Sequence, residues 1–116
     1  ALTMLGLSLT AAGIGKISEI RKRNARREEL DSKSDEDKIH ILMDEIKDRD
    51  ISDDHGWFRA KTRAAESLAQ EVVKKLKERV TSGDLSPSEL KRAKEVLEKY
   101  RNFMTTRHYA MMHAGG

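Results

Sequence analysis

The sequence contains no cysteine among its 116 residues, which excludes disulfide bonds and thiolate metal sites. It has a single proline, so long stretches can form helix without interruption. Only two Phe, two Tyr and one Trp are present. A chain of this length has room for one modest core, and so few aromatic residues do little to fill it. We therefore expect much of the apolar surface to need a partner.

Charge is missing from residues 1–15, ALTMLGLSLTAAGIG, which we call the head. Fifteen helical residues rise about 22 Å, whereas a bilayer crossing takes roughly 20 residues, a length that is reached by continuing to Ile20. Small residues such as Ser8 and Ala12 would allow another helix to approach closely. Three interpretations stay open: a helix buried in a protein assembly, a membrane-associated or membrane-spanning helix over residues 1–20, and a residual targeting segment.

Behind the head, charge is divided into three blocks. Residues 16–27 hold six Lys/Arg and one Glu, a net of +5. Residues 28–54 hold 12 Asp/Glu and four Lys/Arg, a net of −8, and residues 55–116 hold 13 Lys/Arg and seven Asp/Glu, a net of +6. The overall charge of +3 conceals these opposite fields. Such blocks can pair within one chain or between copies of it.

The first basic block is concentrated in the stretch IRKRNARR. Its five cations are Arg21, Lys22, Arg23, Arg26 and Arg27. We call them the basic cluster and regard them as a candidate site for phosphate or another polyanion. Because the cluster has no aromatic residue for base stacking, any nucleic-acid binding would be unspecific and directed to the backbone. Two other interpretations remain: pairing with the acidic block of a neighbouring copy, and a cytoplasmic flank of a membrane segment.

The acidic block contains the signals of a short amphipathic helix. Ser34 stands before three consecutive acids, a pattern that predicts a capped helix start with negative charge in the first turn. Apolar residues then recur at helical spacing and predict a single buried stripe: Ile39, Leu42, Met43 and Ile46.

The C-terminal half predicts two long helices joined by a six-residue turn, which implies an antiparallel hairpin. Gly83 suits the left-handed position that follows a helix. Ser86 is the expected N-cap of the next helix, and Glu89 completes its capping box. A 3-4-3-4 spacing in the last helix predicts a coiled-coil-like seam made of Leu90, Ala93, Leu97, Tyr100 and Met104.

Residues that could hold a metal are scattered. His40 and Asp44 lie one helical turn apart, but no HExxH or similar spacing occurs. Soft ligands near the C-terminus could suit Cu(I): Met104, His108, Met111 and Met112. Methionines in such a pattern more often provide adaptable packing. We expect no metal, cofactor, small-molecule substrate or catalytic residue, since a thin helical hairpin offers little concavity.

These observations predict an all-α protein of three to four helices, elongated, with a C-terminal antiparallel hairpin. Its expected segments are the head and basic helix (1–31), an acidic linker with a short amphipathic helix (32–51) and the hairpin (52–116). We expect a non-enzymatic, homo-oligomeric structural subunit of virion-shell or filament type, located in an assembly particle or at a membrane surface. The expected interface residues are Leu5, Leu7, Leu9 and Ile14 of the head and Leu90, Leu97, Tyr100 and Met104 of the seam. The alternatives are a membrane-anchored helical scaffold and a sequence-independent nucleic-acid-coating protein that uses residues 21–27.

Overall fold

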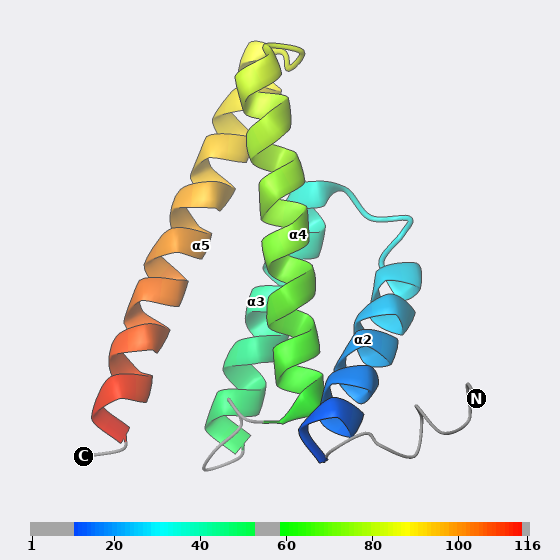
Figure 1. The fold of residues 1–116 in the computed structure, drawn as a ribbon. Helices are drawn as coiled ribbons and strands as arrows, with labels where there is room; N and C mark the ends of the chain where they lie inside the picture. The colour runs from blue at the N-terminus through cyan, green and yellow to red at the C-terminus, as the bar shows by residue number, and fades with distance from the viewer. Residues whose placement is uncertain (1–10, 53–58, 115–116) are drawn as a thin grey trace.

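The computed structural model describes the backbone of residues 11–52 and 59–114 and the side chains of residues 17–52 and 59–113. Within these ranges the chain forms four helices and no strand (Figure 1). The helices are α2 (Ala11–Glu29), α3 (Asp35–Ser52), α4 (Ala60–Ser82) and α5 (Pro87–Ala114). The predicted all-α class is confirmed.

The helix ends are determined by local hydrogen bonds. At the start of α3, the Asp37 amide donates to Ser34 Oγ at 3.2 Å. At the start of α5, the Glu89 amide donates to Ser86 Oγ at 3.3 Å, and the Ser86 amide donates to Glu89 Oε1 at 3.4 Å. Gly83 ends α4 with φ 79° and ψ 12°, a left-handed conformation that glycine adopts without strain. The predicted caps are therefore confirmed at all three positions.

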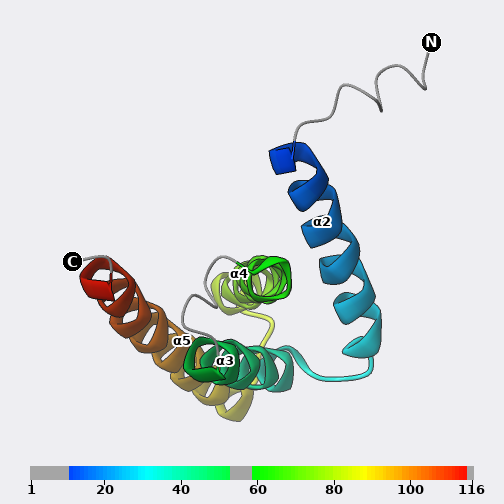
Figure 2. The same cartoon turned by 90° about the horizontal axis from the view of Figure 1, so that it is seen from below.

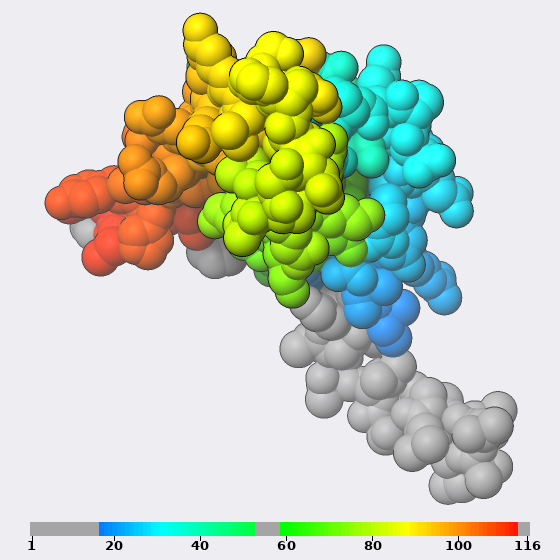
Figure 3. All heavy atoms as spheres, turned by 90° about the horizontal axis from the view of Figure 1, so that it is seen from above, coloured from blue at the N-terminus to red at the C-terminus, as the bar shows by residue number. Residues whose placement is uncertain are grey.

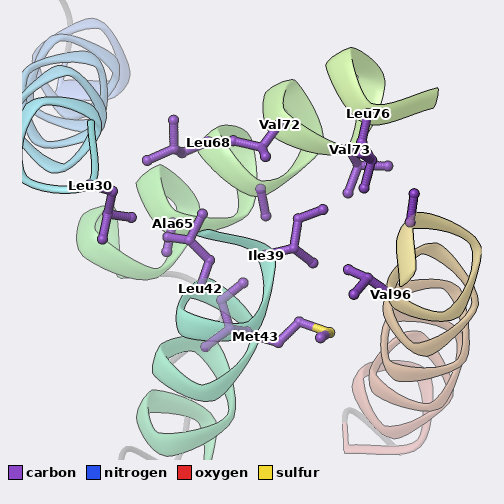
Figure 4. Packing of buried hydrophobic residues seen from close by; sticks show 13 residues of the cluster. Leu30, Ile39, Leu42, Met43, Ala65, Leu68, Val72, Val73, Leu76 and Val96 are labelled. Carbon is purple, nitrogen blue, oxygen red and sulfur yellow. The ribbon is translucent and has the colours of Figure 1, made fainter. Parts of the chain in front are cut away.

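The core lies between α3 and α4 and is extended by α5 (Figure 4). The predicted stripe of α3 is buried as a whole, and Leu30 of the α2–α3 connection packs beside it. From α4 come Ala65, Leu68, Ala69, Val72, Val73 and Leu76. From α5 come Ala93 and Val96. Full burial of one such Leu, Ile or Val side chain contributes roughly 1.5–3 kcal/mol, so this cluster is the main stabilising feature of the fold.

Helix α4 lies between α2 on one side and α5 on the other, as two perpendicular views show (Figures 1 and 2). It contacts α3 and α2 extensively and α5 less. From the turn at Gly83, α5 runs back alongside α4 but diverges from it, and its C-terminal half projects from the body of the molecule (Figure 3). α5 also packs on α3.

The divergence of α5 divides its apolar residues between two environments. Ala93 and Val96 are buried in the core, although Val96 was not a predicted seam residue. The other four predicted seam positions are only half-buried: Leu90, Leu97, Tyr100 and Met104. Because α5 packs on α3 as well as on α4, its buried residues include Val96, which lies outside the predicted seam.

Candidate functional site

The basic cluster lies on α2, and three of its five cations bind partners on other helices of the same chain. Arg27 makes a bidentate contact with Glu71 of α4, from Nε to Oε2 and from Nη2 to Oε1, both at 2.9 Å. Arg26 Nε donates to Glu45 Oε2 of α3 at 3.1 Å. Arg23 Nη1 donates to Ser67 Oγ of α4 at 3.2 Å. These contacts fasten α2 to the core helices.

Among the described residues, no hydrogen bond or ion pair joins the remaining two cations of the basic cluster to another helix. Lys22 Nζ donates to Ser18 Oγ within α2 at 3.2 Å, and Arg21 is exposed. One hypothesis from the sequence pairs this cluster with the acidic block of a neighbouring copy. In the structure Arg26 pairs with Glu45 and with Glu29 (2.6 Å), both in the acidic block of its own chain. The basic cluster thus stabilises the fold of a single copy.

A second charged cluster, which the sequence interpretation missed, joins three helices. Arg107 of α5 is 7% exposed, and its guanidinium makes ion pairs with Asp50 of α3 and Glu66 of α4. Burial raises the pKa of Glu66, against the opposing effect of the Arg107 charge, and the nearby Asp50 carboxylate raises it further. Burial and the Glu66 charge also raise the pKa of Tyr100. We call Arg107, Asp50 and Glu66 the arginine clamp.

The sequence does carry a signal for this clamp. Arg107 continues the buried face of α5 at the spacing Ala93, Val96, Tyr100, Phe103, Arg107, and Asp50 follows Ile46 of the α3 stripe by one turn. A charge that continues an apolar stripe needs a partner in the interior, because burying an unpaired charge is costly. Once the buried faces of the helices are known, a buried Arg107 therefore predicts acidic partners nearby, and a buried Asp50 or Glu66 predicts a basic one.

An open groove lies between α4 and the diverging part of α5. Its volume is about 780 Å³, and its apolar floor is formed by Val73 of α4 with Leu97, Tyr100 and Met104 of α5. A further hollow continues from it along α4 and shares Val73, Lys77, Tyr100 and Met104. We call this combined feature the α4–α5 groove. It exists because α5 diverges from α4 and leaves Leu97, Tyr100 and Met104 only partly covered.

The rim of the α4–α5 groove is mostly basic. Lys74 and Lys77 stand on the α4 side and Arg101 on the α5 side, all exposed. Glu98 is the one carboxylate among the described residues that line the groove, and His108 lies toward the C-terminal end of α5. The groove thus combines an apolar floor with an excess of positive charge around it.

The predicted interface residues fall into two groups. Leu97, Tyr100 and Met104 come together in the α4–α5 groove, whereas Leu90 is half-buried nearer the turn and does not line it. Leu5, Leu7 and Leu9 of the head lie outside the described residues. Ile14 falls within the first turns of α2, and its side chain is not described.

Neither a metal centre nor a membrane span is found in the part of the chain that the structure describes. No three His, Asp or Glu side chains there are grouped so as to hold a metal ion. No helix there combines the length and the apolar character that crossing a bilayer requires.

Comparison of the chain with protein-family models, with curated proteins and with solved structures found no match.

Proposed function

We propose that this protein is a non-enzymatic structural subunit that assembles with copies of itself, and that the α4–α5 groove is one of its assembly interfaces. The observation that carries the proposal is the gathering of Leu97, Tyr100 and Met104 in one groove, each half-exposed. Burying apolar surface gains about 25 cal/mol per Å². A second protein surface that covers this groove would bury the exposed parts of these side chains, and this burial would stabilise the contact between the two copies.

In this proposal the seam of α5 continues from one copy into the next. The N-terminal part of α5 packs on its own core through Ala93 and Val96. The exposed parts of Leu97, Tyr100 and Met104 are covered by a neighbouring subunit, which gives the elongated, coiled-coil-like packing that the 3-4-3-4 spacing favours. Repetition of such a contact builds a shell or a filament.

The internal pairing of the basic cluster supports protein assembly over nucleic-acid coating. Arg27 and Arg26 already neutralise carboxylates on α4 and α3. Binding phosphate with them would require breaking these ion pairs and loosening α2. Assembly through an apolar groove carries no such cost.

The experiment is a mass measurement of the purified protein by light scattering at tens of micromolar, with detergent and nuclease as separate arms. We expect an oligomer whose mass is unchanged by either agent. Met104→Lys places a charge on the groove floor and should reduce the mass, while the helical circular dichroism signal is retained. The matched control is Thr106→Lys, an exposed α5 position outside the groove lining, which should assemble as the parent does.

A monomeric parent protein would overturn the proposal. Loss of the large species with detergent alone would favour the membrane-anchored scaffold instead, and loss with nuclease alone would favour the nucleic-acid-coating protein. Electron microscopy of the particle then distinguishes a closed shell from a filament.

A further inference from the structure

The rim of the α4–α5 groove restricts what can occupy it. In a symmetric dimer the same patch of both copies meets itself. The exposed cations Lys74, Lys77 and Arg101 would then approach their own counterparts, and Glu98 is the one carboxylate among the described lining residues that could compensate. Like charges brought together across an interface are unfavourable. A groove-to-groove contact is therefore disfavoured, and the occupant should be apolar and free of positive charge.

One segment of this chain has that chemistry. The head, residues 1–15, contains no ionisable side chain and is rich in leucine and methionine: Leu2, Met4, Leu5, Leu7 and Leu9. The stripe of α3, by contrast, is already buried in its own core and is not available to another copy. The head also needs cover, because contiguous apolar surface of this size is rarely left exposed to water.

The lengths of the two surfaces match. The groove follows α5 from Leu97 to His108, and eleven helical rises of 1.5 Å correspond to about 16 Å. The ten residues that precede Ala11 reach about 15 Å as a helix and up to about 33 Å when extended. The head is therefore long enough to run along the groove floor.

The position of α2 favours the groove of another copy. Residues 1–10 of the head precede Ala11, where α2 begins, and α2 lies on the side of α4 opposite to α5 (Figures 1 and 2). To enter the groove of its own copy, the head would have to pass around α4. A neighbouring copy presents its groove without this obstacle.

We propose that the head of one copy docks in the α4–α5 groove of the next, with its leucines against Val73, Leu97, Tyr100 and Met104. This inference rests on the proposed function, since it names the partner surface of the same groove. Head and groove are different surfaces, so the contact is heterologous and generates a ring or an open filament according to the rotation between copies. The uncharged head also fits between the rim cations without repulsion.

The absence of cysteine makes a disulfide test direct. Two differently tagged single-cysteine variants of the full chain, Leu7→Cys and Met104→Cys, are mixed and oxidised. A disulfide requires Cβ atoms about 3.5–4.5 Å apart. We expect a heterodimer band several-fold stronger than in the control mixture of Leu7→Cys with Thr106→Cys, whose cysteine lies on the same helix outside the groove lining. Leu97→Cys replaces Met104→Cys if the latter loses its helical circular dichroism signal.

Two further measurements make each outcome decisive. In the first, the double variant Leu7→Cys/Met104→Cys is diluted and then oxidised. A monomeric product with an internal disulfide would show that the head folds onto its own groove, and this result would overturn docking between copies. Heterodimer yield no greater than the control, in a parent protein that light scattering shows to be oligomeric, would also overturn head docking while the proposed assembly stands. A monomeric parent would overturn both.

Discussion

Arg107 of α5 and Asp50 of α3 form a bidentate ion pair across 57 positions of sequence, with Nε to Oδ2 at 2.5 Å and Nη2 to Oδ1 at 3.2 Å. A third guanidinium nitrogen, Nη1, contacts Glu66 of α4. Arg107 lies in the C-terminal half of α5 and links it to both other helices, and Phe103 of the same half packs against the core. The arginine clamp thus connects α5 to both α3 and α4.

Replacing the arginine should be strongly destabilising. Arg107→Met keeps most of the apolar stem but leaves Asp50 and Glu66 without their cation. Removing one partner of a buried ion pair costs about 3–5 kcal/mol, and the 7% exposure of Arg107 leaves little room for solvent to compensate. Urea unfolding should report a loss of this size. Arg101→Met, an exposed arginine of the same helix, should change the free energy of unfolding by no more than about 0.5 kcal/mol, and equal losses in both variants would contradict the role of the clamp.

Glu66 should make the stability depend on pH in a definite direction. Its pKa in the folded state is raised above the ordinary value of 4.5, with burial as the main cause. A raised folded-state pKa means that the stabilisation is fully present below pH 4.5 and is lost as the pH rises through the folded-state pKa. Glu66→Gln is neutral throughout and lacks this loss. The parent should therefore lose stability relative to Glu66→Gln as the pH rises from about 4 toward 7.

The measurement is the free energy of unfolding of both proteins at a series of pH values. Glu78→Gln, an exposed site on the same helix, provides the control for the removal of a carboxylate from α4. If the Glu66→Gln curve is parallel to that of the parent, the Glu66 carboxyl does not titrate with a raised pKa.

Local features of this fold could be predicted from the sequence because the atoms involved are close in the chain. The Ser86 and Glu89 capping box and the left-handed Gly83 each depend on a few adjacent residues. The α3 stripe was also predicted correctly, since that helix has one apolar face. In these cases the residue types and their spacing are compatible with one local structure.

The face that α5 buries could not be predicted in the same way. Its apolar residues occupy more than one face, so Val96 and Leu97 were equally suitable for the core, and the choice depends on where α3 lies. The partners of the basic cluster are equally non-local, because Arg27 and Glu71 are 44 positions apart. Charge blocks indicate that pairing will occur but not whether it occurs within one chain or between copies.

The Arg27–Glu71 pair should couple α2 to α4 weakly and in a salt-dependent way. Both side chains are about 40% exposed, so a double-mutant cycle of Arg27→Gln and Glu71→Gln should give a coupling of about 0.2–1 kcal/mol that falls in 1 M salt. The hydrogen bond from Arg27 lowers the pKa of Glu71. Its stabilisation is therefore present above pH 4.5 and lost as the pH falls through the lowered value.

A matched cycle identifies whether this coupling is specific to the pair. Lys22 donates to Ser18 in its own helix. The changes that Lys22→Gln and Glu71→Gln make to the free energy of unfolding should therefore be additive within about 0.3–0.5 kcal/mol. Equal coupling in the two cycles would indicate a general field of the basic cluster, without a specific contribution from the bidentate contact.

Thr62 is the position where a substitution should increase stability. Its side chain is 0% exposed, and within the part of the chain that the structure describes Oγ1 has no hydrogen-bond partner. A buried polar group without a partner costs about 1–3 kcal/mol. Thr62→Val keeps the shape and the β-branching and removes the hydroxyl, so the free energy of unfolding measured in urea should rise by about 1 kcal/mol.

Thr81→Val on the same helix is the matched control, because that hydroxyl is exposed and donates to the Lys77 carbonyl oxygen at 2.9 Å. Its free energy of unfolding should change by no more than about 0.5 kcal/mol. Destabilisation by Thr62→Val would mean that the hydroxyl is satisfied in the folded protein, and the account of a buried, unpaired group at the start of α4 would then be wrong.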